Sequence, residues 1–127
     1  MNPAEYIESV RELLLTSPIV ESFQIVRQRV TSFDGHLRVR LILLDNGLLE
    51  FSEYFQRMAG GQVQVVTYSY QWLDADNRLI RRWDNTPHFP NLQGFPHHVH
   101  DEPAGAVIPG EPVDIFAILE YLTHLLS

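Results

Sequence analysis

The sequence contains no cysteine and no lysine. Without cysteine, the chain can form neither disulfides nor a thiolate zinc site. It also lacks any apolar run near the roughly 20 residues that a membrane span needs. Its acidic, amphipathic start has neither the basic residues nor the continuous apolar segment of a signal peptide. These absences favour a cytoplasmic protein with no membrane partner.

The lack of lysine leaves arginine as the source of positive charge. Nine arginines stand against 16 acidic residues, and the net charge is −7. This balance argues against a broad basic surface for duplex nucleic acid. Arginine forks match phosphate and carboxylate and stack on aromatic rings, which lysine does poorly. A local groove of arginine and aromatic side chains is therefore compatible with an acidic protein.

The 127 residues, 45% of them hydrophobic and 20% charged, fit one globular domain. The sequence shows no repeat and no linker, so residues 1–127 are predicted to form a single domain. Helical spacing of apolar residues predicts helices over 3–16 and 112–126. The second helix has Ile115, Ile118, Leu119, Leu122 and Leu125 along one stripe.

Alternating apolar residues and turn signals predict five strands between the helices. They span residues 20–33 and 36–45, the segment between Gly47 and Ala59, and residues 62–73 and 78–84. Residues 85–112 are rich in proline, glycine and histidine and are predicted to form a long ordered loop. The predicted fold is α+β: a five-stranded antiparallel meander with an N-terminal and a C-terminal helix packed on one face.

Turn chemistry sets the predicted register. A two-residue turn at Asp34-Gly35 places Val30 opposite Val39 and Arg29 opposite Arg40. The apolar face then carries Val26, Val30, Val39, Leu41 and Leu43, and the other face carries Arg27, Arg29, Arg38 and Arg40. A three-residue loop with Gly47 left-handed pairs Leu43 with Leu49 and Leu41 with Phe51. Pairing Leu73 with Arg78 puts Tyr68, Tyr70, Trp72, Leu79, Arg81 and Trp83 on one face.

The second of these turns also carries Glu53 onto the apolar face, beside Val39. A buried carboxylate without a partner costs several kcal/mol. We therefore predict that Glu53 accepts hydrogen bonds from a tyrosine hydroxyl or from Arg81, and so orients a cation of the functional site. The alternative is that the strand ends earlier and Glu53 is solvated.

The stretch from Tyr68 to His100 concentrates the reactive side chains, with both tryptophans and four of the six histidines. Its aromatic residues are Tyr68, Tyr70, Trp72 and Trp83. They form either a stacking platform for bases beside Arg81 or the core face of two paired strands. Adjacent Arg81 and Arg82 point to opposite faces of a strand. Asp84-Asn85 follows the strand, and this pair is also common simply because it starts turns.

The histidine cluster is the strongest chemical signal. His88, His97, His98 and His100 fall within thirteen residues. In an extended segment His98 and His100 point the same way and His97 points opposite. Three roles compete: general acid–base catalysis, a divalent metal site completed by Asp84, and structural hydrogen bonding. The spacing matches no compact zinc motif.

The run YSYQW, a short acidic turn, RRWDNTPHFP and FPHHVH together resemble the TumE family. These are small bacterial proteins described as the toxin component of a toxin–antitoxin pair. The resemblance covers residues 65–100 closely, and the whole chain in length and element order. Gln71 stands where the family often has histidine, and Val99 where it often has lysine. The resemblance implies a cytoplasmic toxin whose partner is a separately encoded antitoxin.

The leading hypothesis is a toxin that acts on RNA as a ribonuclease. Its base and acid would come from His88, His97, His98 and His100, and Arg81 or Arg82 would hold the phosphate. The candidate substrate-binding residues are Tyr68, Tyr70, Trp72, Trp83, Asp84, Asn85 and Glu53. No cofactor is expected under this hypothesis. The alternatives are a non-catalytic protein-binding module and a metal-dependent hydrolase, and a homo-oligomer is left open.

Overall fold

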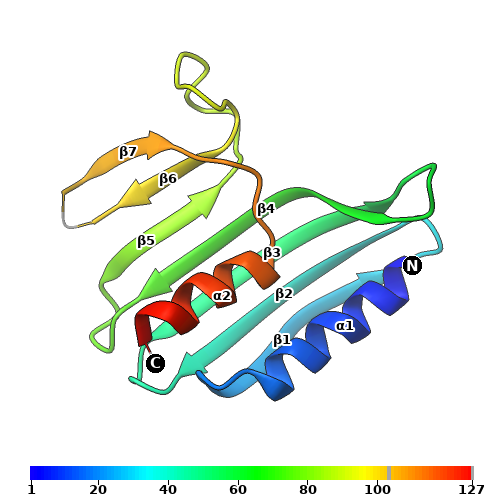
Figure 1. The fold of residues 1–127 in the computed structure, drawn as a ribbon, viewed down its shortest axis with the longest axis horizontal. Coiled ribbons are helices and arrows are strands. Elements are labelled where there is room, and N and C mark those ends of the chain that lie inside the picture. Colours follow the sequence, from blue (N-terminus) through cyan, green and yellow to red (C-terminus); the bar gives the residue numbers. More distant parts are fainter. Residues whose placement is uncertain (103, 127) are drawn as a thin grey trace.

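The computed structural model describes residues 1–102 and 104–126, which form two helices and seven strands (Figure 1). The helices are α1 (Pro3–Thr16) and α2 (Ile115–Leu126). The strands are β1 (Val20–Val30), β2 (Asp34–Leu43), β3 (Leu48–Arg57), β4 (Val63–Leu73), β5 (Leu79–Asp84), β6 (His98–Asp101) and β7 (Ala106–Pro109). The prediction of an α+β fold with a helix near each end is confirmed.

The predicted number of strands is wrong. The described strands form one antiparallel sheet in the order β1 to β7, so each strand pairs with its neighbours in the chain. The two extra strands, β6 and β7, form a hairpin within residues 85–112, which were predicted to be a loop. Each of them has four residues, and the surrounding prolines and glycines leave only a weak local strand signal.

Both helices lie on the same face of the sheet, α1 along β1 and β2 and α2 across β3 and β4 (Figure 1). A capping box starts α1: the Asn2 side chain accepts a hydrogen bond from Glu5 N at 2.8 Å, and the Glu5 carboxylate accepts one from Asn2 N at 3.0 Å. The helix predicted over 112–126 begins later, at Ile115. Leu125 is 54% exposed, so it does not belong to the buried stripe of α2.

The predicted turn between β1 and β2 is also wrong. The chain turns over Thr31–Asp34, where Thr31 N donates to Asp34 O at 2.8 Å and the Thr31 hydroxyl donates to Asp34 Oδ1 at 2.7 Å. Val30 consequently pairs with Gly35 and not with Val39. Val26 and Val30, predicted on the apolar face, are 51% and 41% exposed.

Two further registers differ from the prediction but keep the predicted faces. Between β2 and β3, Asn46 is the left-handed residue with φ 67°, and Leu41 pairs with Leu49. Between β4 and β5, Tyr70 pairs with Trp83. Each of these pairings lies two residues from the predicted one. Side chains alternate with a period of two along a strand, so a shift of two leaves the buried face unchanged.

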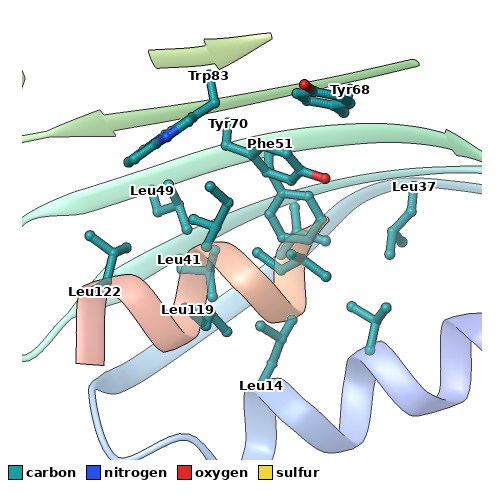
Figure 2. Packing of buried hydrophobic residues seen from close by; sticks show 14 of the residues in the cluster. Leu14, Leu37, Leu41, Leu49, Phe51, Tyr68, Tyr70, Trp83, Leu119 and Leu122 are labelled. Carbon is teal, nitrogen blue, oxygen red and sulfur yellow. The ribbon is translucent and has the colours of Figure 1, made fainter. Parts of the chain in front are cut away.

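The core lies between the sheet and the helices (Figure 2). Helix α1 contributes Leu14, and α2 contributes Leu119 and Leu122. The strands contribute Leu37, Leu41, Leu49, Phe51, Tyr68, Tyr70 and Trp83, among others. This face of the sheet therefore carries most of the buried core over β2 to β4.

The opposite face, called the open face here, carries polar residues in two rows across five strands. One row is Arg38, Ser52, Ser69, Asp84 and His98, and the other is Arg40, Glu50, Gln71, Arg82 and His100. Paired residues on antiparallel strands share a face. The two rows therefore run side by side from the arginines of β2 to the histidines of β6.

Candidate functional site

The β5–β6 pair assembles the candidate site at one end of the open face. Asp84 pairs with His98, and Arg82 pairs with His100. Between these pairs, Trp83 and Val99 point into the core, where both are buried. We call Arg82, Asp84, His98 and His100 the Asp84 cluster. The alternation of buried apolar and polar residues on both strands turns all four side chains to one side.

The Asp84 carboxylate lies at the centre of this cluster. Its Oδ1 atom lies 2.8 Å from His98 Nε2 and accepts a hydrogen bond from Thr86 N at 3.1 Å. Its Oδ2 atom lies 3.6 Å from His100 Nε2 and accepts from Arg82 Nε at 3.1 Å. Arg82 Nη2 also lies 3.1 Å from His100 Nε2. One carboxylate thus meets two imidazoles and one guanidinium.

His98 is 2% exposed, and its two ring nitrogens differ in surroundings. Nδ1 lies 3.0 Å from the Pro96 carbonyl, which can only accept, so Nδ1 carries a hydrogen. Nε2 lies close to Asp84 Oδ1 but outside hydrogen-bond geometry, and has no hydrogen-bond partner among residues 1–102 and 104–126. Buried polar atoms are rarely left in this way.

The remaining groups of the cluster are nearer solvent. The Arg82 side chain is 36% exposed and lies at the rim. Burial lowers the pKa of His100 below its ordinary value, and the nearby Arg82 charge adds to this effect. The Phe89 ring packs edge-on against His98, with ring centres 4.9 Å apart, and lies 6.1 Å from the His100 ring centre. The segment between β5 and β6 therefore covers part of the cluster with an aromatic wall.

The structure separates Arg81 from Arg82. Arg81 lies on the helix-covered face, where its guanidinium bonds Asp101 at 3.0 Å and the Tyr121 hydroxyl at 3.2 Å. It also lies over the Trp83 ring, with 5.9 Å between Cζ and the ring centre. Arg81 thus ties α2 to β5 and β6 and does not join the Asp84 cluster.

The four candidate aromatic residues lie in the core and not on a solvent-facing platform. Tyr68, Tyr70, Trp72 and Trp83 are all buried on the helix-covered face. Bases cannot stack on rings that the two helices and the neighbouring strands enclose. Their placement matches the alternative that the sequence left open, in which they are the core face of paired strands.

His97 and His88 are not part of the Asp84 cluster, although the charge of His88 acts on the His100 pKa. The Tyr68 hydroxyl lies 2.7 Å from His97 Nδ1, and the two rings stack with centres 5.8 Å apart. Burial lowers the pKa of His97, and burial raises the pKa of Tyr68 to about 12. His88 is exposed beside Phe89. The predicted opposite orientations of His97 and His98 therefore correspond to different surroundings on either side of the sheet.

Asn85 and Glu53 have structural surroundings. Asn85 accepts a hydrogen bond from Tyr68 N at 3.0 Å and donates to Val66 O at 2.8 Å, so it fastens the end of β5 to β4. Glu53 is fully buried and accepts hydrogen bonds from Tyr70 and Tyr6, each at 2.6 Å, and from Ile115 N at 3.0 Å. Burial raises its pKa, although these hydrogen bonds act in the other direction.

The predicted tyrosine partner of Glu53 is thus confirmed by Tyr70. Tyr6 and Ile115 were missed because they come from the helices, whose distance from Glu53 no strand register gives. The predicted link from Glu53 to a cation of the site is wrong, since Arg81 bonds Asp101 and Tyr121. The Pro96 carbonyl and Phe89 were missed as well, because residues 85–112 were treated as one loop.

The polar rows continue from the Asp84 cluster across the open face to β2, with a hollow over β2 to β4. A hollow of about 230 Å³ is lined by Arg38, Glu50, Phe51, Ser52, Ser69 and Gln71. Glu50 bridges Arg40 at 2.9 Å and Arg38 at 3.9 Å. The sequence placed Arg38 and Arg40 on the polar face of β2, but only the register across five strands aligns them with Arg82 and the histidines.

Among the described residues, no helix is both long and apolar enough to cross a membrane. No curated protein and no solved structure matches the chain. The model of one family, described as Toxin TumE, matches residues 10–125. That match spans nearly the whole chain, including the complete sheet and the Asp84 cluster, and the chain therefore belongs to the TumE toxin family.

Proposed function

We propose that this chain is the toxin of a toxin–antitoxin pair and that it cleaves RNA at the Asp84 cluster. Family membership supports the toxin role and an antitoxin partner. The observation that carries the RNA assignment is the alignment of Arg38, Arg40 and Arg82 on the open face with His98 and His100 at its end. This alignment joins phosphate-binding cations to groups that can handle protons.

Cleavage of a phosphodiester needs a cation for the phosphate and groups that move protons at the attacking and leaving oxygens. Arg82 lies at the rim, where its planar fork suits a phosphate. Its neighbours, Asp84, His98 and His100, supply a carboxylate and two imidazoles within one cluster. Arg82 is therefore assigned to phosphate binding and the other three to the reacting oxygens.

The net charge of −7 does not exclude RNA, because its sign need not hold over each face. Arg38 and Arg40 share the single carboxylate of Glu50, so this end of the open face keeps an excess positive charge. A single strand presents phosphates along its length and can follow the polar rows of the open face. Single-stranded RNA is the substrate form that this face suits best.

The first test expresses the protein without its antitoxin and follows growth. Wild type should arrest growth, and Arg82→Gln should relieve the arrest while leaving the melting temperature close to that of wild type. Arg78→Gln is the matched control, because it removes the same charge from an exposed turn at the far end of β5. Growth that continues when the intact protein accumulates would remove the toxin proposal.

The second test follows a labelled single-stranded RNA with purified protein. The double change Arg38→Gln/Arg40→Gln should weaken RNA binding at low salt. It should also reduce the slope of log K against log[salt] by about 0.7 for each phosphate that the variant no longer neutralises. If RNA stays intact in chelator-free buffer, with divalent cations present, while growth still stops, the toxin has another target and the RNA proposal fails.

A further inference from the structure

We propose that Asp84, His98 and His100 bind a divalent metal ion. One donor atom from each residue lies within 4.8 Å of the others, and two of the three side chains are buried. The proposal deepens the function proposed above, because it names a cofactor for the same cluster. Metal binding itself is measurable without RNA.

The first argument comes from His98, whose ring orientation is fixed by its Nδ1 hydrogen bond to the Pro96 carbonyl. A hydrogen on Nδ1 leaves the Nε2 lone pair of a neutral imidazole directed toward the cluster. Metal-binding histidines are oriented in the same way, with the other ring nitrogen donating to a carbonyl or carboxylate. The bond to the Pro96 carbonyl thus orients His98 as a metal ligand before any ion binds.

The second argument is the short approach of His98 Nε2 to Asp84 Oδ1. These two atoms lie 2.8 Å apart without hydrogen-bond geometry. Both carry lone pairs when the imidazole is neutral, and in a buried site such atoms repel unless positive charge lies between them. A metal ion bound to both atoms satisfies the orphaned nitrogen and offsets the carboxylate charge.

The third argument is the position of Arg82. Its Nη2 atom now lies against His100 Nε2, and its Nε atom donates to Asp84 Oδ2. A divalent ion on the same two residues would repel the guanidinium, and the exposure of Arg82 at the rim leaves it room to turn outward. Metal binding would then release the Arg82 fork toward a phosphate on the open face.

The donor set indicates the class of metal. Two imidazole nitrogens with one carboxylate oxygen suit zinc and the other first-row divalent ions better than calcium or magnesium. Three protein ligands leave coordination positions free, as in catalytic sites. Such an ion would polarise a phosphate oxygen and lower the pKa of a bound water, which would then take over the proton transfers assigned above to the imidazoles. We therefore infer Zn²⁺ or Mn²⁺ as the class of ion to test.

The test uses untagged full-length protein, stripped with chelator and titrated with Zn²⁺ and, separately, Mn²⁺ by calorimetry and elemental analysis. One equivalent of at least one ion should bind. His100→Ala and Asp84→Asn should weaken binding by more than roughly 100-fold, since loss of a residue that merely orients a ligand already costs about 10–100-fold. His124→Ala, which removes an exposed imidazole from the last turn of α2, should bind as wild type does.

Two further measurements separate the possible failures. Circular dichroism of each variant distinguishes a missing ligand from a missing fold, and His100→Ala is the decisive variant because His100 is only half-buried. Binding below a tenth of an equivalent, or equal binding by folded His100→Ala, overturns the metal site. RNA cleavage that persists in chelator also overturns it while leaving the proposed function intact. Metal binding without RNA cleavage supports the metal site and overturns the proposed RNA cleavage.

Discussion

At the scale of single residues, Glu53 shows how a buried acid can organise a fold. Its two carboxylate oxygens accept hydrogen bonds from Tyr6 on α1, Tyr70 on β4 and the first backbone N–H of α2 at Ile115. A carboxylate near the start of a helix also interacts favourably with the helix dipole. One side chain of β3 therefore fixes both helices against the sheet.

The raised pKa of Glu53 predicts how stability depends on pH. Burial lifts its folded-state pKa above the ordinary value of 4.5, so the folded state holds the proton more tightly. This contribution to stability is complete below about pH 4.5 and is lost as the pH rises through the folded-state pKa. Glu53→Gln cannot titrate, so its stability relative to wild type should increase over that window.

The measurement is urea unfolding of wild type and Glu53→Gln from pH 4 to pH 8. The difference between the two proteins is the quantity to follow, because other titrating groups cancel in it. A glutamine can still accept from Tyr70 and Ile115 and donate to the Tyr6 oxygen, so the variant should fold. A difference that stays constant with pH would contradict the assigned shift.

Predictions for single residues were correct where only the face of the strand had to be known, and not the exact partner. Glu53 was correctly placed on the buried face although its strand register was wrong, because the error was two residues. The Thr31–Asp34 turn failed for a different reason. There the Asp-Gly signal was outweighed by side-chain hydrogen bonds of Thr31 and Asp34, which the Asp-Gly pattern does not take into account.

At the scale of elements, the pairing of β2 with β3 depends on a glycine. A Cβ atom at Gly35 would lie 2.5 Å from the ring of Phe55, which is fully buried. That ring also packs on Tyr6, with ring centres 4.6 Å apart. The side chain opposite Gly35 therefore has little room to move, and β2 can pair closely with β3 only because position 35 has no side chain.

Gly35→Ala should destabilise the protein by about 1–3 kcal/mol, the usual cost of overpacking a core. Gly60→Ala is the matched control, because its nearest neighbour is the end of the flexible Gln62 side chain, so it should change stability far less. Chemical denaturation of both variants beside wild type gives the comparison. Equal stabilities for the two variants would show that Phe55 shifts without cost.

The β6–β7 hairpin was the element that sequence could not supply. In β6 a single apolar residue, Val99, lies between His98 and His100. One apolar residue is too little for a periodic signal. Without β6 there was no register to align His98 and His100 with Asp84 and Arg82. The sequence therefore predicted the residues of the Asp84 cluster as candidate site residues together with Arg81, His97 and the buried aromatics. Only the strand pairing separates the cluster from these other candidates.

At the scale of the whole molecule, the strands of the sheet differ in how far the helices shield them from solvent. The helices cover the face built by β1 to β4, whereas β6 and β7 extend beyond them (Figure 1). In β7 all four residues are at least partly exposed, and in β6 the buried residues are His98 and Val99. The candidate site thus combines one strand, β5, in which only Trp83 and Asp84 are buried, with one that lacks helical cover.

Amide hydrogen exchange should follow this gradient. Backbone amides of β2, β3 and β4 should exchange slowest, at rates near global unfolding, and those of β7 should exchange much faster through local opening. Mass spectrometry of exchanged peptides can resolve the two regions. Added Zn²⁺ or Mn²⁺ should slow exchange in β6 if the metal site is correct, and equal protection of β3 and β7 would contradict the gradient.

The order of the strands has a consequence for synthesis of the protein. Each strand pairs with the strand made just before it, so the sheet can lengthen step by step as the nascent chain leaves the ribosome. Asp84 gains its imidazole neighbours only when β6 joins β5. At roughly 5–20 residues per second, the chain passes most of its translation time without an assembled Asp84 cluster. A nascent chain therefore holds an Asp84 cluster only after residues 98–101 have been made and have joined β5.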